Sequence, residues 1–176
     1  MKAEDFALKL KINSPSVVDY INNGYNEKLA IKTVNTFNIK KKKEKSNFND
    51  ELLELVDCYT TKNFEVATVN FYENIVERSD FVIVGTVEAD WLIVDKSTGF
   101  IKVIELYSEI SLWDCAVNGG KFLDAILEAK LYIMKSSLGD KLLRNKFDCF
   151  VAEECGRFAG GDQFIEFYKM LLGCFE

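Results

Sequence analysis

Histidine is absent from this 176-residue chain, and proline occurs once, at Pro15. Without histidine the chain cannot assemble a Ser-His or Cys-His nucleophile pair, nor a histidine-based general acid or base. The five cysteines are scattered without a C-x-x-C pair, which removes most of the support for a zinc site or a disulfide framework. Cys149 and Cys155 therefore fit apolar packing better than catalysis. We expect buried or free thiols, no metal and no cofactor.

Long hydrophobic runs are missing as well. No stretch of about 18 apolar residues occurs, so we expect no membrane-spanning helix and no membrane partner. The first twelve residues lack the apolar core of a signal peptide, and with the scattered cysteines this favours a cytoplasmic protein. The formal net charge is -6, which is a poor match for nucleic acid and suits a basic partner better.

The composition supports one folded domain over residues 1–176, because 48% of the residues are apolar. Near the N-terminus, Ser16 and Asn23-Gly24 are typical of the start and end of a short helix. The apolar alternation of residues 29–39 predicts a strand. Residues 40–50 form a lysine-rich loop, which is either a solvated connection or a basic arm that contacts phosphate or a membrane.

The middle of the chain is predicted to be helix and then sheet. Residues 49–59 begin with Asn49 or Asp50 as an N-cap and continue with apolar residues at helical spacing. Residues 64–72 predict one strand, and residues 81–107 predict two or three more, with a tight turn from Asp95 to Gly99. The apolar run after Trp91, itself assigned to the core, exceeds simple alternation, which indicates a strand covered on both faces.

The C-terminal part, residues 119–176, is predicted to be helical. Asn118 and the glycines after it belong at the start of an amphipathic helix that extends to residue 137. Residues 139–158 predict a second helix. A third follows, with Asp162 as its cap, an apolar face that includes Phe175, and a stop near Gly173.

Carboxylates gather around the predicted hairpin, and they are the candidate functional groups. Glu88 and Asp90 are two residues apart, so on a strand they would point to one side, whereas Asp95 lies at the far end of the hairpin. They could serve a carboxylate-dependent hydrolase or display an acidic surface. Trp113, in a predicted loop, and its neighbour Asp114 are candidates for the same partner-binding surface. No catalytic constellation and no metal-ligand spacing emerges.

The chain resembles the SUKH superfamily, which holds fungal cell-wall assembly regulators of the Smi/Knr type and bacterial toxin-immunity proteins. The resemblance lies in residues 81–85, in "DWLIVDKSTGFIKVI" (90–104) and in "LWDCAVNGGKFLDAIL" (112–127). The tail "CGRFAGGDQFIEFYKMLL" (155–172) is similar to bacterial members. Of the family's N-terminal signature only Asn23-Gly24 is present.

The resemblance implies an α+β domain with a curved, mostly antiparallel sheet flanked by helices, and no enzymatic activity. It implies an immunity protein that occludes a toxin domain, and the acidic charge would suit a basic toxin. Two alternatives stay open, a regulator of cell-wall assembly and a carboxylate-dependent hydrolase. On the first hypothesis Glu88, Asp90, Asp95, Trp113 and Asp114 belong to the partner-binding surface.

Overall fold

A six-stranded antiparallel sheet forms the centre of the computed structural model, which describes residues 1–139 and 148–174. Its strands lie side by side in chain order and curl into a half-barrel. The strands are β1 (Glu65–Val66), β2 (Val69–Glu77), β3 (Phe81–Val87), β4 (Asp90–Asp95), β5 (Ile101–Ile104) and β6 (Ser111–Ala116). Each strand is joined to the next by a short connection, as in a meander.

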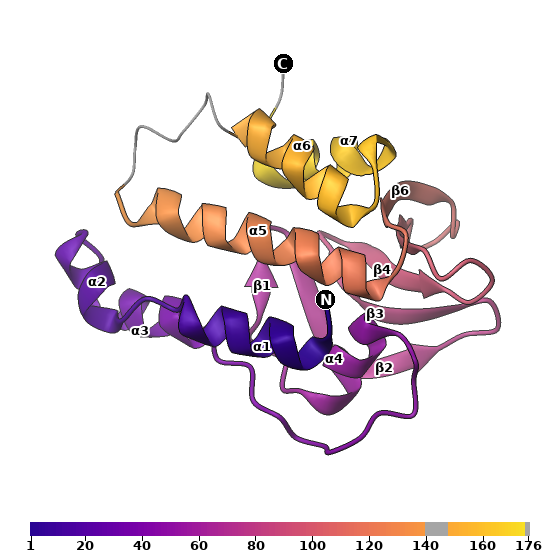
Figure 1. Cartoon of the computed structure of the whole chain (residues 1–176), viewed down its shortest axis with the longest axis horizontal. Helices are drawn as coiled ribbons and strands as arrows, with labels where there is room; N and C mark the ends of the chain where they lie inside the picture. Colours follow the sequence, from indigo (N-terminus) through magenta and orange to yellow (C-terminus); the bar gives the residue numbers. More distant parts are fainter. Residues whose placement is uncertain (140–147, 175–176) are drawn as a thin grey trace.

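Helices precede and follow the sheet (Figure 1). Before it come α1 (Ala3–Ile12), α2 (Val17–Asn22), α3 (Glu27–Asn35) and α4 (Glu51–Cys58). After it come α5 (Gly119–Ser137), α6 (Asp148–Ala159), the 3-10 turn η2 (Asp162–Phe164) and α7 (Ile165–Leu172). Helix α5 contacts α1, α4 and α6, so it is the central helix of this layer. The predicted α+β class and the curved antiparallel sheet flanked by helices are confirmed.

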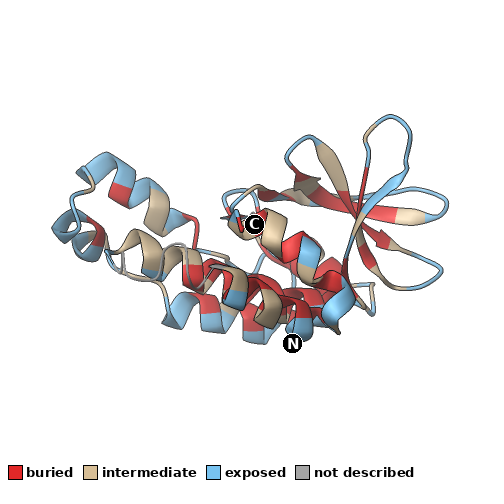
Figure 2. Cartoon of the chain, turned by 90° about the horizontal axis from the view of Figure 1, so that it is seen from above, coloured by how far each residue is buried: buried red, intermediate tan, exposed pale blue. Residues whose placement is uncertain are grey.

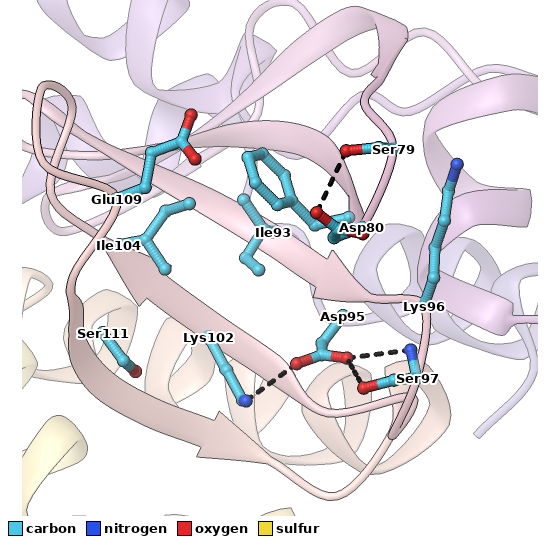
Figure 3. Close-up of a pocket in the computed structure, with 11 residues that line it drawn as sticks. Ser79, Asp80, Ile93, Asp95, Lys96, Ser97, Lys102, Ile104, Glu109 and Ser111 are labelled. Carbon is cyan, nitrogen blue, oxygen red and sulfur yellow. Dashed lines mark hydrogen bonds and ion pairs between the residues drawn. The ribbon is translucent and has the colours of Figure 1, made fainter.

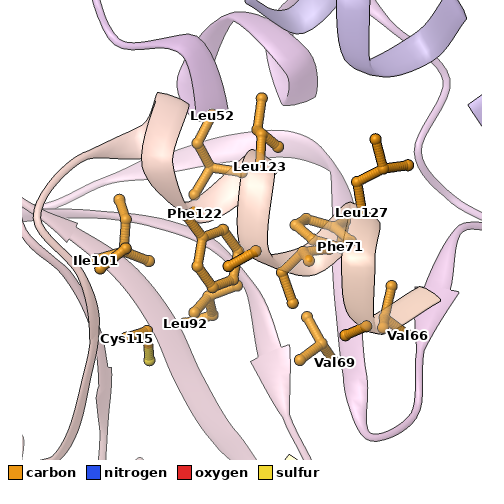
Figure 4. Close-up of a cluster of buried hydrophobic side chains, with 14 of the residues drawn as sticks. Leu52, Val66, Val69, Phe71, Leu92, Ile101, Cys115, Phe122, Leu123 and Leu127 are labelled. Atoms are coloured by element: carbon orange, nitrogen blue, oxygen red, sulfur yellow. The ribbon is translucent and has the colours of Figure 1, made fainter. Parts of the chain in front are cut away.

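The core lies between the sheet and helices α4 and α5 (Figure 4). Leu52 from α4 and Phe122 and Leu123 from α5 are fully buried, and Leu92 and Ile101 from the sheet belong to the same cluster. Figure 2 shows the buried residues concentrated where the helices meet the strands. Burial of each such side chain stabilises the fold by about 1.5 to 3 kcal/mol.

Several predicted helix boundaries are confirmed by their caps. The Ser16 side chain accepts a hydrogen bond from the Asp19 N–H in a capping box at the start of α2. Asp50 caps α4, and the Asn118 side chain accepts from the Lys121 N–H at the start of α5. The left-handed Gly173, with φ of 72°, ends α7 as predicted.

The strand predicted over residues 29–39 is wrong, because most of this segment belongs to helix α3. Asn26 caps that helix by accepting a hydrogen bond from the Leu29 N–H. Of the helix residues only Ala30 is fully buried, while Leu29 and Ile31 are exposed. The alternation of apolar residues therefore did not mark a buried strand face.

The single strand predicted over residues 64–72 is also incorrect, because the chain reverses within it. Strands β1 and β2 pair in an antiparallel fashion through Val66 and Val69. The turn between them contains Ala67 with a φ of 50°, a left-handed conformation that is uncommon for alanine. Nothing in the residue types of this turn signals the reversal.

Strand β6 replaces the loop predicted before α5. Trp113 pairs with Val103 of β5, and Asp114 pairs with Lys102. The register shifts twice along this pair of strands, so that the apolar alternation in the sequence is interrupted. A strand with two irregularities has a weak sequence signature.

The last predicted helix does not begin with the cap that the sequence indicated. The prediction of Asp162 as a cap is wrong, because Asp162 is the first residue of the 3-10 turn η2, whose N-cap is Gly161, and the N-cap of α7 is Phe164. Helix α6 confirms the second part of the helix predicted over residues 139–158, and its first part falls on residues 140–147, outside the described residues. Phe175 also lies outside them.

Two of the five cysteines form a disulfide, contrary to the expectation of free or buried thiols. Cys149 of α6 and Cys174, just after α7, are bonded with their Cα atoms 5.4 Å apart. Cys58, Cys115 and Cys155 are free and buried, and burial raises the pKa of each thiol. A thiol of raised pKa is a poor nucleophile, so packing accounts for these three.

The lysine-rich loop of residues 40–50 has no helix or strand, apart from a bridge between Lys41 and Tyr59. Two of its lysines form ion pairs with the rest of the protein. The Lys43 Nζ lies 2.9 Å from an Asp57 oxygen, and the Lys42 Nζ lies 3.8 Å from a Glu73 oxygen. Among the described residues, no helix combines the length and apolarity needed to cross a bilayer.

Candidate binding groove on the open face of the sheet

The two faces of the sheet have different neighbours. Leu92, Val103 and their neighbours on one face belong to the large core. Every described helix side chain that belongs to a buried hydrophobic cluster lies in this core. The opposite face carries a separate cluster of Ile83, Ile93 and Ile104, whose members all come from strands. We call this second face the open face, because no helix side chain within the described residues joins its cluster.

A groove of about 550 Å³ lies on the open face (Figure 3). We call it the open-face groove. Its floor is apolar and its rim carries serines, carboxylates and lysines; its lining residues are Ser79, Asp80, Phe81, Ile93, Asp95, Lys96, Ser97, Lys102, Ile104, Glu109 and Ser111. An apolar floor with a few polar groups at its rim is the usual composition of a binding site.

Asp95 is held in place by four hydrogen bonds. One oxygen accepts from the Ser97 N–H at 2.9 Å, the Ser97 hydroxyl at 2.6 Å and the Thr98 N–H at 3.1 Å. The other accepts from the Lys102 Nζ at 2.8 Å (Figure 3). The bond with Lys102 and those from the turn hold the pKa of this carboxyl well below its usual range. Asp95 is therefore an ionised structural group rather than a proton acceptor at neutral pH.

The lysines of the groove are occupied by partners from the protein itself. Lys102 is paired with Asp95, and the Lys96 Nζ donates to the Arg78 carbonyl oxygen at 2.6 Å and lies 3.5 Å from a Glu77 oxygen. Asp80 accepts a hydrogen bond from the Ser79 hydroxyl at 3.0 Å. Within the described residues, neither Asp80 nor Glu109 has a basic partner. The rim therefore presents uncompensated negative charge.

Exposed apolar side chains lie beside the groove, on the connection between β5 and β6 and at the start of β6. Tyr107 is 91% exposed, Ile110 is 63% exposed and Leu112 is 43% exposed. They bracket Glu109 and Ser111, which line the groove. Large apolar side chains next to a polar rim are typical of surfaces that other proteins bind.

The five residues predicted for the binding surface divide between the two faces. Asp95 lines the groove. Asp114 lies opposite Lys102 in the backbone pairing of β5 and β6, and the Lys102 side chain faces the same groove. Glu88, Asp90 and Trp113 instead line a cavity of about 120 Å³ together with Met170 of α7. Trp113 packs partly buried against the large core, so its role there is structural.

The inference that Glu88 and Asp90 share one side of a strand is wrong. Glu88 lies in the turn between β3 and β4 with a φ of 54°, and only Asp90 belongs to a strand. Asp90 and Asp95 are the two ends of β4, about 16 Å apart at about 3.3 Å per residue. That separation exceeds the ~5 to 9.5 Å between the paired carboxylates of glycosidases. No group of three metal-ligating side chains occurs in the described part of the chain.

Asp80 and Glu109 were missed by the sequence reasoning, because both lie in connections outside the strands. Lys102 has a recognisable signal, since it interrupts the apolar residues Ile101 and Val103 and must face away from the core. The groove depends on how β3, β4 and β5 curl past one another, and no single segment indicates that.

Comparison of the chain with models of protein families, with curated proteins and with solved structures gives no match. Membership of the SUKH superfamily therefore stays a prediction that depends on the sequence motifs alone.

Proposed function

We propose that this protein is a non-enzymatic binding module that docks a basic protein domain on the open-face groove. The observation that carries the proposal is the pair of carboxylates, Asp80 and Glu109, without basic partners beside the exposed side chains of Tyr107 and Ile110. Carboxylates at the rim attract a basic partner, and the apolar groups provide area to bury on contact.

The chemical inventory supports binding over catalysis. Asp95 is saturated with hydrogen bonds, and the thiols that remain free are buried. With histidine absent, the usual general acid or base is missing. An immunity protein that occludes a toxin is the form of this function that the motifs resembling the SUKH superfamily favour. A regulator of cell-wall assembly would use the same binding chemistry on another partner.

The test is co-expression with a basic toxin domain encoded beside this gene, followed by growth measurement and co-purification. We expect the wild-type protein to restore growth and to co-purify with the toxin, more weakly as salt rises. The double variant D80K/E109K should lose both properties. The control E4K/E27K makes the same charge change on exposed positions of α1 and α3 and should retain them.

Two results would overturn the proposal. The first is an absence of binding to any toxin encoded nearby. The second is equal loss in the groove variant and in the control, since net charge rather than the groove would then govern binding. Binding to a partner whose expression does not affect growth would favour the regulatory alternative.

A further inference from the structure

Lys130, on helix α5, is buried with only 8% of its surface exposed. Its Nζ donates to the Thr36 hydroxyl at 3.0 Å and to the Glu65 carbonyl oxygen at 2.9 Å. It also lies 4.5 Å from the centre of the Phe37 ring, where the face of the ring attracts a cation. Among the described residues no carboxylate forms an ion pair with it. A buried ammonium without such a partner is rare and is costly for the fold.

A second cavity, of about 240 Å³, lies against this lysine. Both hydrogen-bond acceptors of Lys130, Thr36 and Glu65, line it, and so does Phe64, whose ring centre is 5.9 Å from the Nζ. The cavity has room for about eight water molecules at about 30 Å³ each, or for a phosphate with a small organic group. Lys130 therefore stands directly behind its wall.

Two exposed lysines line the cavity itself, Lys32 of α3 and Lys62 in the turn before β1. Neither has a carboxylate partner within the described residues. The amides of Asn35 and Asn63 add hydrogen-bond donors. Glu65 is the one acidic side chain among the described lining residues, so two lysines of the lining face one carboxylate, and the Lys130 ammonium lies behind the wall.

We propose that this cavity, which lies between α3 and the turn before β1 with Lys130 behind its wall, binds the phosphate group of a small phosphomonoester. The charge decides between the oxyanions that lysines and amides could hold. Lys32 and Lys62 against Glu65 leave an excess of one positive charge in the lining, and the Lys130 ammonium behind the wall adds a second. This total matches a phosphate with about 1.5 to 2 negative charges at pH 7 better than a single carboxylate. Lysines are common phosphate ligands in proteins.

The site is separate from the open-face groove. It lies among helix α3, the start of the sheet and α5, whereas the groove is built from β3, β4, β5 and the connections beside them. Phosphate binding would therefore persist in D80K/E109K. The two proposals can fail independently.

The experiment is titration calorimetry at pH 7.5 and constant ionic strength in chloride, with inorganic phosphate, glycerol 2-phosphate and a phosphoserine peptide as probes. We expect saturable binding of the first two. The variant K32Q/K62Q should bind at least tenfold more weakly. The control K9Q/K121Q removes two exposed lysines elsewhere and should bind as the wild type does. K130M should also weaken binding, with circular dichroism to verify that it folds.

The proposal is overturned if phosphate gives no saturable heat, or if the control variant loses as much affinity as K32Q/K62Q. Binding of the phosphoserine peptide without binding of either small phosphate would refute the proposal that the ligand is a small molecule. Should K130M fail to fold, the comparison of the two double variants decides the question alone.

Discussion

The carboxylate of Asp50 accepts a hydrogen bond from the backbone N–H of Gly119 at 2.9 Å, although the two residues are 69 positions apart. Its other oxygen accepts from the N–H groups of Leu52 and Leu53. One half-buried side chain thus satisfies backbone donors at the starts of both α4 and α5. The two helices that cover the sheet are fixed to each other at this point.

Replacement of Asp50 by alanine is expected to lower the free energy of unfolding by about 2 to 3 kcal/mol. The loss combines a helix cap, worth about 1 kcal/mol, with a buried N–H of Gly119 left without an acceptor. Urea denaturation measures it. The matched control is S16A, which removes an exposed cap from α2 and should cost no more than about 1 kcal/mol. Equal losses in the two variants would contradict the shared role of Asp50.

Gly119→Ala is expected to destabilise the protein, although helix propensity alone would favour alanine by about 1 kcal/mol. An added Cβ would lie 2.3 Å from an Asp50 oxygen and 2.5 Å from the Leu52 nitrogen, which is backbone and cannot move aside cheaply. In the comparison variant Gly120→Ala the nearest atoms lie at 3.2 Å and two of them belong to the Glu51 side chain, so its loss should be smaller. Thermal unfolding of both variants ranks their stabilities. A Gly119→Ala variant more stable than the wild type would refute the close approach of Gly119 to Asp50 and Leu52.

Lys130 should make stability depend on pH. Burial lowers the pKa of this lysine to about 8 in the folded protein, against an ordinary value of 10.5. Between these values the unfolded chain binds more protons, so the free energy of unfolding contributed by Lys130 rises with pH. Relative to that of K130M, the free energy of unfolding of the wild type should rise by about 2 to 3 kcal/mol from pH 7 to pH 10. Denaturation of both proteins in phosphate-free buffers tests this, and a constant difference would show that the lysine does not titrate there.

Reduction of the Cys149–Cys174 disulfide is expected to cost about 3 kcal/mol, since the bond closes a loop with a sequence separation of 25 residues. The double variant C149S/C174S should show a similar loss and no further response to reductant. Alkylation of the denatured protein, followed by mass spectrometry, counts the thiols directly. Three labels without reductant and five with it would confirm the bond, whereas five labels in both samples would exclude it.

The elements that the sequence predicted well are those whose signals are local. The helix α4 begins at a cap, the helix α5 carries a long amphipathic pattern, and the turn from Asp95 to Gly99 contains a glycine with a φ of 75°. Each signal lies within a few residues of the structure that it specifies. Local chemistry therefore sufficed for the main helices and the central hairpin.

The features that were missed depend on contacts between distant segments. Strand β6 exists because β5 pairs with it through two irregularities. Lys130 was not singled out, because its burial depends on hydrogen-bond acceptors at Thr36 and Glu65, which are far from it in the sequence. The groove joins Asp80 to Glu109, from two different connections. Periodicity within a segment carries no information about such pairings.

The meander order of the sheet has a consequence for how the protein forms during synthesis. Each strand meets its predecessor soon after it is made, so hairpins can form one at a time from contacts that are close along the chain. The apolar side of that sheet stays uncovered by Phe122 and Leu123 until α5 leaves the ribosome. The newborn chain is thus most prone to self-association in the interval between completing its last strand and completing its central helix.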